Sequence, residues 1–256
     1  MNYLLLGALG RSTKNWENFS DFLKREDPTA NVHFLDLPGY GDEKHVGSPA
    51  SIHKITNYVR RKWLKLLQHK EGPWCILCIS LGGMVALNWM GRYPKDFKAG
   101  VLINTSSARI SPPKDRLRPS ARKQVFQIMR SSSFRTREAN ILKLTSSQDP
   151  RNLREIYKNR VRRAHAVPIT TFLKQLLAAA LYIPPKIITT PLLFLASEKD
   201  KMVNPVCSRD LAFYYSCDVH VHPTGGHELQ IDDPAWVAKH TAQFCTSNSS
   251  SHSEKS

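Results

Sequence analysis

A serine lies between an apolar run and two glycines in the segment CISLGGMVAL, which places Ser80 between Ile79 and Leu81. The apolar run predicts a buried strand and the following residues predict a helix, so Ser80 would occupy the turn between them. Such a turn crowds the backbone and requires small residues two positions before and after the serine, where Cys78 and Gly82 stand. Ser80 is therefore a candidate nucleophile. The segment alone fits a serine that caps a helix equally well.

Two later segments supply the other groups that a serine nucleophile needs. Asp200 follows an expected strand at 192–196, and His227 lies in the glycine-containing segment TGGH after the last expected strand, 219–221. His227 would take the proton from Ser80, and Asp200 would fix the tautomer of the imidazole. Because the three residues follow strand ends in this chain order, they predict a Ser–Asp–His triad. Glu198 is the alternative acid if Asp200 points away.

The elements that must position these residues alternate along the chain. Strands are expected at 3–6, 32–37, 74–79, 101–103, 192–196 and 219–221, and helices at 15–25, 51–68, 81–93, 205–215 and 234–244. Apolar strands separated by helices are typical of a parallel sheet covered on both faces. We therefore expect an α/β fold with a doubly wound, mostly parallel sheet of about six strands. Ligands of such sheets bind outside the carboxyl ends of the strands.

The alternation stops between residues 105 and 186, where the sequence predicts three or four helices, at 121–129, 137–144, 153–164 and 170–181. The interval begins near SPP and closes with PPK, which suggests two hinges. The expected organisation is a core in two parts, 1–104 and 187–245, a helical cap at 105–186 and a disordered tail at 246–256. An apolar stripe on the last cap helix would form cap core, with its inner edge against an acyl pocket (Phe172, Leu176, Leu177 and Leu181).

Positive charge is concentrated in the cap. The chain of 256 residues carries a net charge of +16, and residues 110–186 contain 17 Lys and Arg against 4 Asp and Glu. The remaining residues contain 20 against 17. The cap helices are either solvated basic surfaces or an electropositive entrance that steers an anionic substrate or an acidic carrier protein. No zinc-finger spacing and no RNA-motif aromatics accompany the charge, so no nucleic-acid partner is expected.

Other features of the sequence bear on the cellular location of the protein and on whether it binds a metal or a cofactor. The first residues predict a strand and not a signal peptide. The sequence contains no uninterrupted run of 18 apolar residues, so no transmembrane helix is expected. Five cysteines, an odd number, favour reduced thiols in a cytoplasm. Cys75 and Cys78 lie within one apolar strand, and the histidines at 220, 222 and 227 have no further carboxylate at ligand spacing. We expect neither a metal nor a cofactor.

Four motifs together resemble the α/β-hydrolase superfamily over nearly the whole chain up to the tail: CISLGGMVAL, DLPGYGDE, LFLASEKDKMVNP and HPTGGHELQIDDP. The chain is most similar to small capped esterases of bacteria, the group that includes the pimeloyl-acyl-carrier-protein methyl ester esterases. The resemblance implies a cofactor-free ester or amide hydrolase that forms an acyl-enzyme on Ser80. It also implies an oxyanion hole made by the backbone N–H groups of Leu81, at a helix N-terminus, and Ala8.

The sequence departs from the family pattern at three places. It starts at the strand before the oxyanion loop, so the family's first hairpin is expected to be absent and the sheet to have six strands. The family's His-Gly before the oxyanion loop is here Leu6-Gly7, and Cys78 replaces the more common glycine of the serine turn. A backbone donor needs no particular side chain, so Ala8 keeps the expected position of the second donor. The missing histidine bears on the geometry of this loop, and a lost donor would cost about 10²–10³ in rate.

The expected function is a serine hydrolase acting on carboxylic esters. Its substrate would be a medium acyl ester with an anionic other end, as a small molecule or bound to a carrier protein. Three alternatives remain: a carbon–carbon bond hydrolase on the same triad, a catalytically silent scaffold that binds an acidic partner through its cap, or a protein that binds a polyanion or a membrane surface. A dehalogenase is excluded because it would need an acidic nucleophile at position 80.

Overall fold

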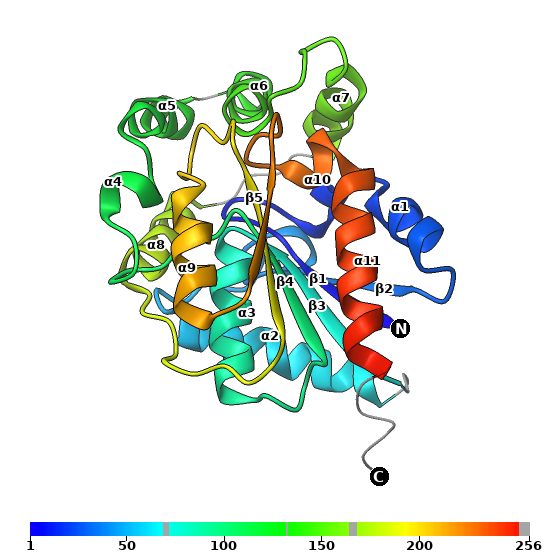
Figure 1. The fold of residues 1–256 in the computed structure, drawn as a ribbon. Coiled ribbons are helices and arrows are strands. Elements are labelled where there is room, and N and C mark those ends of the chain that lie inside the picture. Colours follow the sequence, from blue (N-terminus) through cyan, green and yellow to red (C-terminus); the bar gives the residue numbers. More distant parts are fainter. Residues whose placement is uncertain (69–71, 132, 164–167, 251–256) are drawn as a thin grey trace.

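The core of the molecule is a six-stranded parallel sheet covered by helices on both faces (Figure 1). The computed structural model describes residues 1–68, 72–131, 133–163 and 168–250. The strands lie in the order β2-β1-β3-β4-β5-β6, and every neighbouring pair is parallel. Their bounds are Asn2–Leu6 (β1), Asn31–Leu35 (β2), Trp74–Ile79 (β3), Ala99–Ile103 (β4), Leu192–Ser197 (β5) and Asp218–His222 (β6). The predicted α/β sheet is confirmed.

Alternation of side chains along the central strands builds two apolar layers. In β1, Leu4 and Leu6 pack with one layer, whereas Tyr3 and Leu5 pack with the other. The four central strands are buried along their whole length, which explains why they are continuously apolar in the sequence. The edge strands β2 and β6 are partly exposed and carry polar residues.

Helices on opposite faces complete the two layers. One face is covered by α2 (Ile52–Leu67), α3 (Leu81–Arg92) and α9 (Val206–Tyr215). The other face is covered by α1 (Phe19–Glu26) and α11 (Pro234–Ser250). The remaining helical segments of the core are short: η1 (Thr13–Trp16), η2 (Gly41–Glu43) and α10 (Leu229–Asp232).

Two helices of the core differ most from the sequence-based expectation. The helix expected at 15–25 is divided into η1 and α1 because Glu17 between them has a φ of 50°, which ends the first turn. The helix expected at 234–244 continues to Ser250, so residues 246–250, expected in a disordered tail, are helical. The rest of that tail, 251–256, lies outside the described residues.

The helical insertion lies over the carboxyl ends of the strands. It contains α4 (Pro113–Arg116), α5 (Pro119–Arg130), α6 (Phe134–Thr145), α7 (Arg154–Arg163) and α8 (Ile169–Leu181). Helices α5, α6 and α7 form the top layer in Figure 1. Residues of this insertion share one cavity with residues that directly follow the strands. The insertion α5–α8 is therefore a cap, as predicted; α4 is a short additional helix, and residue 164 of the expected third helix lies outside the described part.

No helix within the described ranges is long and apolar enough to cross a membrane.

Candidate active site

Ser80 lies in a strained turn between β3 and α3. Its backbone has φ 53° and ψ −113°, a region that residues other than glycine rarely adopt. Two bonds hold this conformation: the N–H of Ser80 donates to the carbonyl of Ile103 at 2.8 Å, and its carbonyl accepts from Thr105 Oγ1 at 2.8 Å. A serine held in this way presents its side chain at the end of the sheet, as a nucleophile requires.

Close backbone packing explains the small residues around the serine. A Cβ atom built on Gly82 would lie 2.7 Å from the carbonyl oxygen of Gly7 and 2.8 Å from that of Leu6. Helix α3 can therefore begin directly against the end of β1 only with glycine at position 82. Cys78 is buried in the layer on the α3 side, and burial raises the pKa of its thiol well above the usual value.

Cys75 and Cys78 do not form a pair. Cys75 packs in the opposite layer of the sheet, because side chains three positions apart on a strand point to opposite faces. In the described part of the chain, no group of three or more His, Cys, Asp and Glu residues is arranged to hold a metal ion. His222 instead accepts the backbone N–H of Gly225 at 2.7 Å and contacts Asp233, so it shapes the loop before His227.

Asp200 and His227 are in direct contact. The Nδ1 atom of His227 lies 2.7 Å from Oδ2 of Asp200, and both side chains are almost completely buried. The other carboxylate oxygen of Asp200 accepts the backbone N–H groups of Met202 at 2.7 Å and Val203 at 3.0 Å. Glu198, the alternative acid, is half-exposed and pairs with Arg209 at 3.0 Å. The geometry therefore favours Asp200 as the partner of His227.

The surroundings of His227 favour its charged form. Burial alone lowers the pKa of an imidazole, but the Asp200 carboxylate and its hydrogen bond outweigh burial and raise the pKa of His227. The Glu228 carboxylate adds to this rise, and the Arg11 guanidinium opposes it. An imidazole in this setting can accept a proton and hold it while the reaction proceeds.

Asn104, which the sequence reasoning missed, holds the histidine loop. It follows β4 with a φ of 45°, and its Nδ2 donates to the carbonyl oxygens of His227 at 2.9 Å and Gly226 at 3.2 Å. The same amide group donates to Ser197 Oγ at the end of β5. The signal for this role is a single polar residue directly after the apolar strand AGVLI.

A cavity of about 300 Å³ brings the candidate residues together. Ser80, His227 and Ala8 all line it, from three different strand ends. Cap side chains form an apolar wall opposite them: Val125, Ile128, Met129, Phe134, Ile141, Phe172 and Leu176. An apolar chamber above a serine and a histidine suits the binding of an acyl chain.

The apolar stripe of α8 divides between the cavity and solvent. Phe172 and Leu176 line the cavity, as expected for the inner edge. Leu177 and Leu181, expected in the cap core, are 50% and 65% exposed. The expectation was wrong for these two because α8 is apolar around most of its circumference, and the face that packs inward carries Thr171 and Gln175 instead. Gln175 donates to the carbonyl of Pro38 at 2.9 Å.

The loop after β1 forms a tight turn beside the serine. Ala8 accepts the backbone N–H of Arg11 at 3.2 Å, and Gly10 has a φ of 75°. This hydrogen bond and a left-handed third residue are typical of a type II turn. Leu81, the other expected oxyanion donor, is the first residue of α3. Both expected donors thus belong to segments that meet at the close contact between Gly82 and Gly7.

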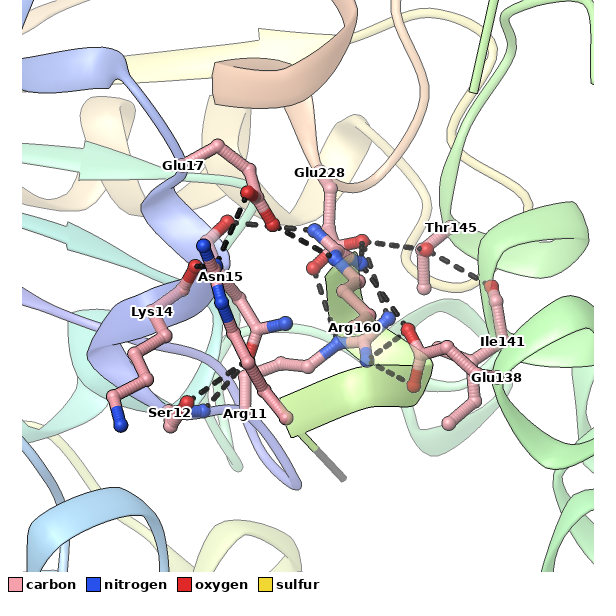
Figure 2. Close-up of polar contacts among 11 residues, drawn as sticks. Arg11, Ser12, Lys14, Asn15, Glu17, Glu138, Ile141, Thr145, Arg160 and Glu228 are labelled. Carbon is pink, nitrogen blue, oxygen red and sulfur yellow. Dashed lines mark hydrogen bonds and ion pairs between the residues drawn. The ribbon is translucent and has the colours of Figure 1, made fainter. Parts of the chain in front are cut away.

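A buried ion-pair cluster lines part of the same cavity and joins the cap to the core (Figure 2). Arg11 contacts Glu138 of α6 at 2.8 Å and Glu228 at 3.1 Å, and Arg160 of α7 contacts Glu228 at 2.9 Å. Burial raises the pKa of Glu228, but the two guanidiniums outweigh this effect and lower it to about 2. The sequence reasoning missed this cluster, since its members come from distant segments.

Several basic residues of the cap have structural roles. Arg160 is buried in the ion-pair cluster, and Arg116 donates to backbone carbonyls near the end of α8. Arg122 donates to the carbonyl of Leu117 at 3.1 Å. Other basic side chains of the cap are exposed to solvent: Lys123, Arg130, Arg135, Arg154 and Arg162. The positive field of the cap therefore arises from only part of its Lys and Arg residues.

A protein-family comparison matches residues 9–234 to the family described as "Serine aminopeptidase, S33". The chain belongs to this family of serine hydrolases within the α/β-hydrolase superfamily. A comparison with curated proteins finds no match.

Solved structures of the same fold cover nearly the whole chain. A serine hydrolase from Cycloclasticus zankles is 22% identical, with 95% of this chain and 89% of that chain covered and a TM-score of 0.73. An enol-lactonase from Burkholderia xenovorans LB400 is 19% identical, with coverages of 96% and 91% and a TM-score of 0.75. A thermophilic esterase from Thermogutta terrifontis is 17% identical, with 98% and 91% covered and a TM-score of 0.71. At these identities the likeness shows the fold alone.

Proposed function

We propose that this protein is a carboxylic ester hydrolase with Ser80 as nucleophile, His227 as general base and Asp200 as the acid that orients it. One observation carries the proposal. His227, which contacts Asp200 at 2.7 Å, and Ser80, in its strained turn, line one cavity, and each of the two follows a strand. The names of structural neighbours, an esterase and an enol-lactonase, agree with ester chemistry. The core would comprise residues 1–104 and 187–245, with the cap at 105–186.

The first half of the reaction would acylate the serine. His227 Nε2 takes the proton from Ser80 Oγ as Oγ attacks the ester carbonyl, and the carbonyl oxygen becomes an oxyanion. The imidazolium then gives its proton to the leaving alcohol as the carbon–oxygen bond breaks, which leaves an acyl-enzyme. Asp200 stabilises the imidazolium during this step, consistent with the raised pKa of His227.

The second half would hydrolyse the acyl-enzyme. A water molecule gives one proton to His227 and its oxygen attacks the acyl carbonyl. Collapse of the intermediate returns the proton to Ser80 Oγ and releases the carboxylic acid. The backbone N–H groups of Leu81 and Ala8 would stabilise the oxyanion in both halves, a contribution of about 10²–10³ in rate for each donor.

The substrate would have an apolar acyl chain of medium length and an anionic distal end. The apolar wall of the cap supports the first property, and the exposed basic residues of the cap support the second. The anionic end would belong to the small molecule or to an acidic carrier protein that docks on the cap. Either form would be attracted by the positive field.

An activity-based probe tests the proposed chemistry. A fluorophosphonate should label the wild-type protein and should fail to label Ser80→Ala, with the modified peptide containing residue 80. A panel of p-nitrophenyl esters should then show turnover that Ser80→Ala abolishes. Absence of wild-type labelling would indicate a silent scaffold. Labelling without ester turnover, but with cleavage of a vinylogous diketone, would indicate a carbon–carbon bond hydrolase.

A further inference from the structure

The turn that carries Ala8 ends at Arg11, whose side chain is one of the most buried arginines of the protein. Arg11 is 6% exposed. Its backbone N–H closes the turn on the Ala8 carbonyl, so the position of its side chain also fixes the position of the turn. A buried guanidinium is costly unless carboxylates pair with it in good geometry. The carboxylates that pair with Arg11 are therefore the contacts to consider for the position of this loop.

Two carboxylates from different parts of the chain fix the Arg11 guanidinium (Figure 2). Glu138 of α6 accepts two hydrogen bonds from Nη1, at 2.8 and 3.1 Å. Glu228, the residue directly after His227, contacts Nε at 3.1 Å and Nη2 at 3.3 Å. The planar guanidinium is thus held along its Nε–Nη2 edge by Glu228 and at Nη1 by Glu138, which fixes its orientation as well as its position.

The remaining members of the cluster hold these carboxylates. Glu228 also accepts from Arg160 at 2.9 Å and from Thr145 Oγ1 at 2.9 Å. Arg160 reaches Glu138 at 3.4 Å, so two guanidiniums and two carboxylates surround one another. The charges balance inside the cluster, which allows all four side chains to remain buried or nearly so.

We propose that Arg11 is a positioning residue for the oxyanion hole. Its ion pairs with Glu138 and Glu228 hold the turn that contains Ala8 in a fixed position relative to the loop that carries His227. This inference rests on the proposed ester hydrolysis. It accounts for the departure at Leu6-Gly7, where the histidine of the family pattern is missing. In this protein the loop is held at Arg11, the last residue of the Ala8 turn. One of the two carboxylates that hold Arg11, Glu138, belongs to the cap.

Two charge-balanced double variants test the role of Arg11. Arg11→Met with Glu138→Gln removes one buried cation and one buried anion, and leaves the Arg160–Glu228 pair. Arg160→Met with Glu17→Gln also removes one buried cation and one nearly buried anion, because Glu17 lies 3.5 Å from Arg160, and it leaves the ion pairs of Arg11 with Glu138 and Glu228 in place. The two variants therefore remove the same charges and differ in whether the ion pairs of Arg11 remain. The second variant is the matched control for lost burial and stability.

The readout is the ratio of kcat/KM for a p-nitrophenyl ester to kcat/KM for its thionoester, in which sulfur replaces the carbonyl oxygen. Sulfur is a poor acceptor for backbone N–H donors, so an intact oxyanion hole raises this ratio. A variant that is only less stable lowers both rates together and leaves the ratio unchanged. We expect the Arg11 variant to lower the ratio at least tenfold and the Arg160 variant to leave it within twofold of wild type.

An unchanged ratio in a folded Arg11 variant would overturn the inference, as would an equal fall in both variants. If wild-type protein is neither labelled by the fluorophosphonate nor active on esters, the proposed function has failed instead. Gly10→Ala is a second route to the same answer if the Arg11 variant does not fold. It disturbs the turn through the φ of 75° without touching the charges, and it should lower the ratio as well. An unchanged ratio in Gly10→Ala would also count against the inference.

Discussion

His227 Nδ1 and Asp200 Oδ2 lie 2.7 Å apart in a site where both side chains are almost completely buried. Because Asp200 is also held by two backbone N–H groups, its carboxylate cannot turn away from the imidazole without breaking them. This contact fixes which imidazole nitrogen carries the proton and leaves Nε2 for the serine. It also makes the site sensitive to pH, because the pKa of His227 is raised.

The activity of the wild-type protein should fall as the pH decreases through a value above 6.5, because a general base must be neutral to accept a proton. Burial and Arg11 lower the pKa of His227, whereas Asp200 and Glu228 raise it. Glu228→Gln should therefore lower the pKa of His227 and move the acid limb of the pH profile of kcat/KM to lower pH. Glu198→Gln, which removes an exposed carboxylate, should leave the limb in place. An identical acid limb in all three proteins would contradict this assignment.

Gly82→Ala should reduce both activity and stability. Its new Cβ would meet the carbonyl oxygens of Gly7 and Leu6 at 2.7 and 2.8 Å, and these are backbone atoms that cannot rotate away. We expect a loss of about 1–3 kcal/mol in the free energy of unfolding. The turnover number should fall as well, since the serine turn and the Ala8 loop are pushed apart.

Gly47→Ala is the matched control for this substitution, since nothing lies within 4 Å of a Cβ at that position. Chemical denaturation and ester turnover, measured on both variants, check the prediction. If the two variants had the same free energy of unfolding and the same ester turnover, the close packing at Gly82 would matter for neither property.

The fold could be predicted because its signals are local. Each buried strand is a short apolar run. Ser80 directly follows one such run, Asp200 lies in the turn after another, and His227 lies in the loop after the edge strand β6, so their positions along the chain indicated their position at the sheet edge. The sequence pattern of α8 was less informative. Its residues ITTFLKQLLAAAL are apolar on most sides, so periodicity alone could not tell that Leu177 faces solvent while its neighbour Leu176 faces the cavity.

The ion-pair cluster could not be predicted, for a different reason. Arg11 and Glu228 are 217 positions apart, and Arg160 lies in the strongly basic helix sequence REIYKNRVRR. Charged residues on cap helices have the same pattern whether they face water or a buried partner. Only the packing of the cap against the core distinguishes Arg160, which is buried, from exposed neighbours such as Arg162. Part of the positive charge of the cap therefore belongs to buried ion pairs and not to the free surface.

Leu176→Ala should change the preference for acyl chain length, because Leu176 lines the cavity. Loss of apolar contact to a substrate is worth about 1–3 kcal/mol, so kcat/KM for the best ester should fall about tenfold or more. Leu177→Ala removes the same side chain from the exposed face of the same helix and should leave the profile unchanged. A panel of p-nitrophenyl esters of increasing chain length measures both. Parallel profiles for the two variants would argue against an acyl site at this wall.

Reversing exposed charge on the cap should slow the reaction of anionic esters. Lys123→Glu with Arg135→Glu changes two exposed side chains, and Lys24→Glu with Lys65→Glu changes the net charge equally on helices of the core. Only the cap variant should lower kcat/KM for the monomethyl ester of a dicarboxylic acid, by severalfold. The difference should vanish in about 1 M salt, where the Debye length is about 3 Å. Equal rates for the two variants at low salt would refute steering by the cap.

Acid should weaken the protein through Glu228. Its pKa is lowered from 4.5 to about 2, so its ion pairs contribute stability that is fully present above pH 4.5 and is lost as the pH falls through about 2. The shift corresponds to about 3 kcal/mol.

Glu228→Gln should be less stable than wild type at pH 7, and the difference in the free energy of unfolding should narrow as the pH falls from 4.5 toward 3. Glu26→Gln, which removes an exposed carboxylate of α1, should show no such narrowing. Urea denaturation of the three proteins between pH 7 and pH 3 measures the difference. A constant difference between Glu228→Gln and wild type across this range would mean that Glu228 does not hold its charge through Arg11 and Arg160.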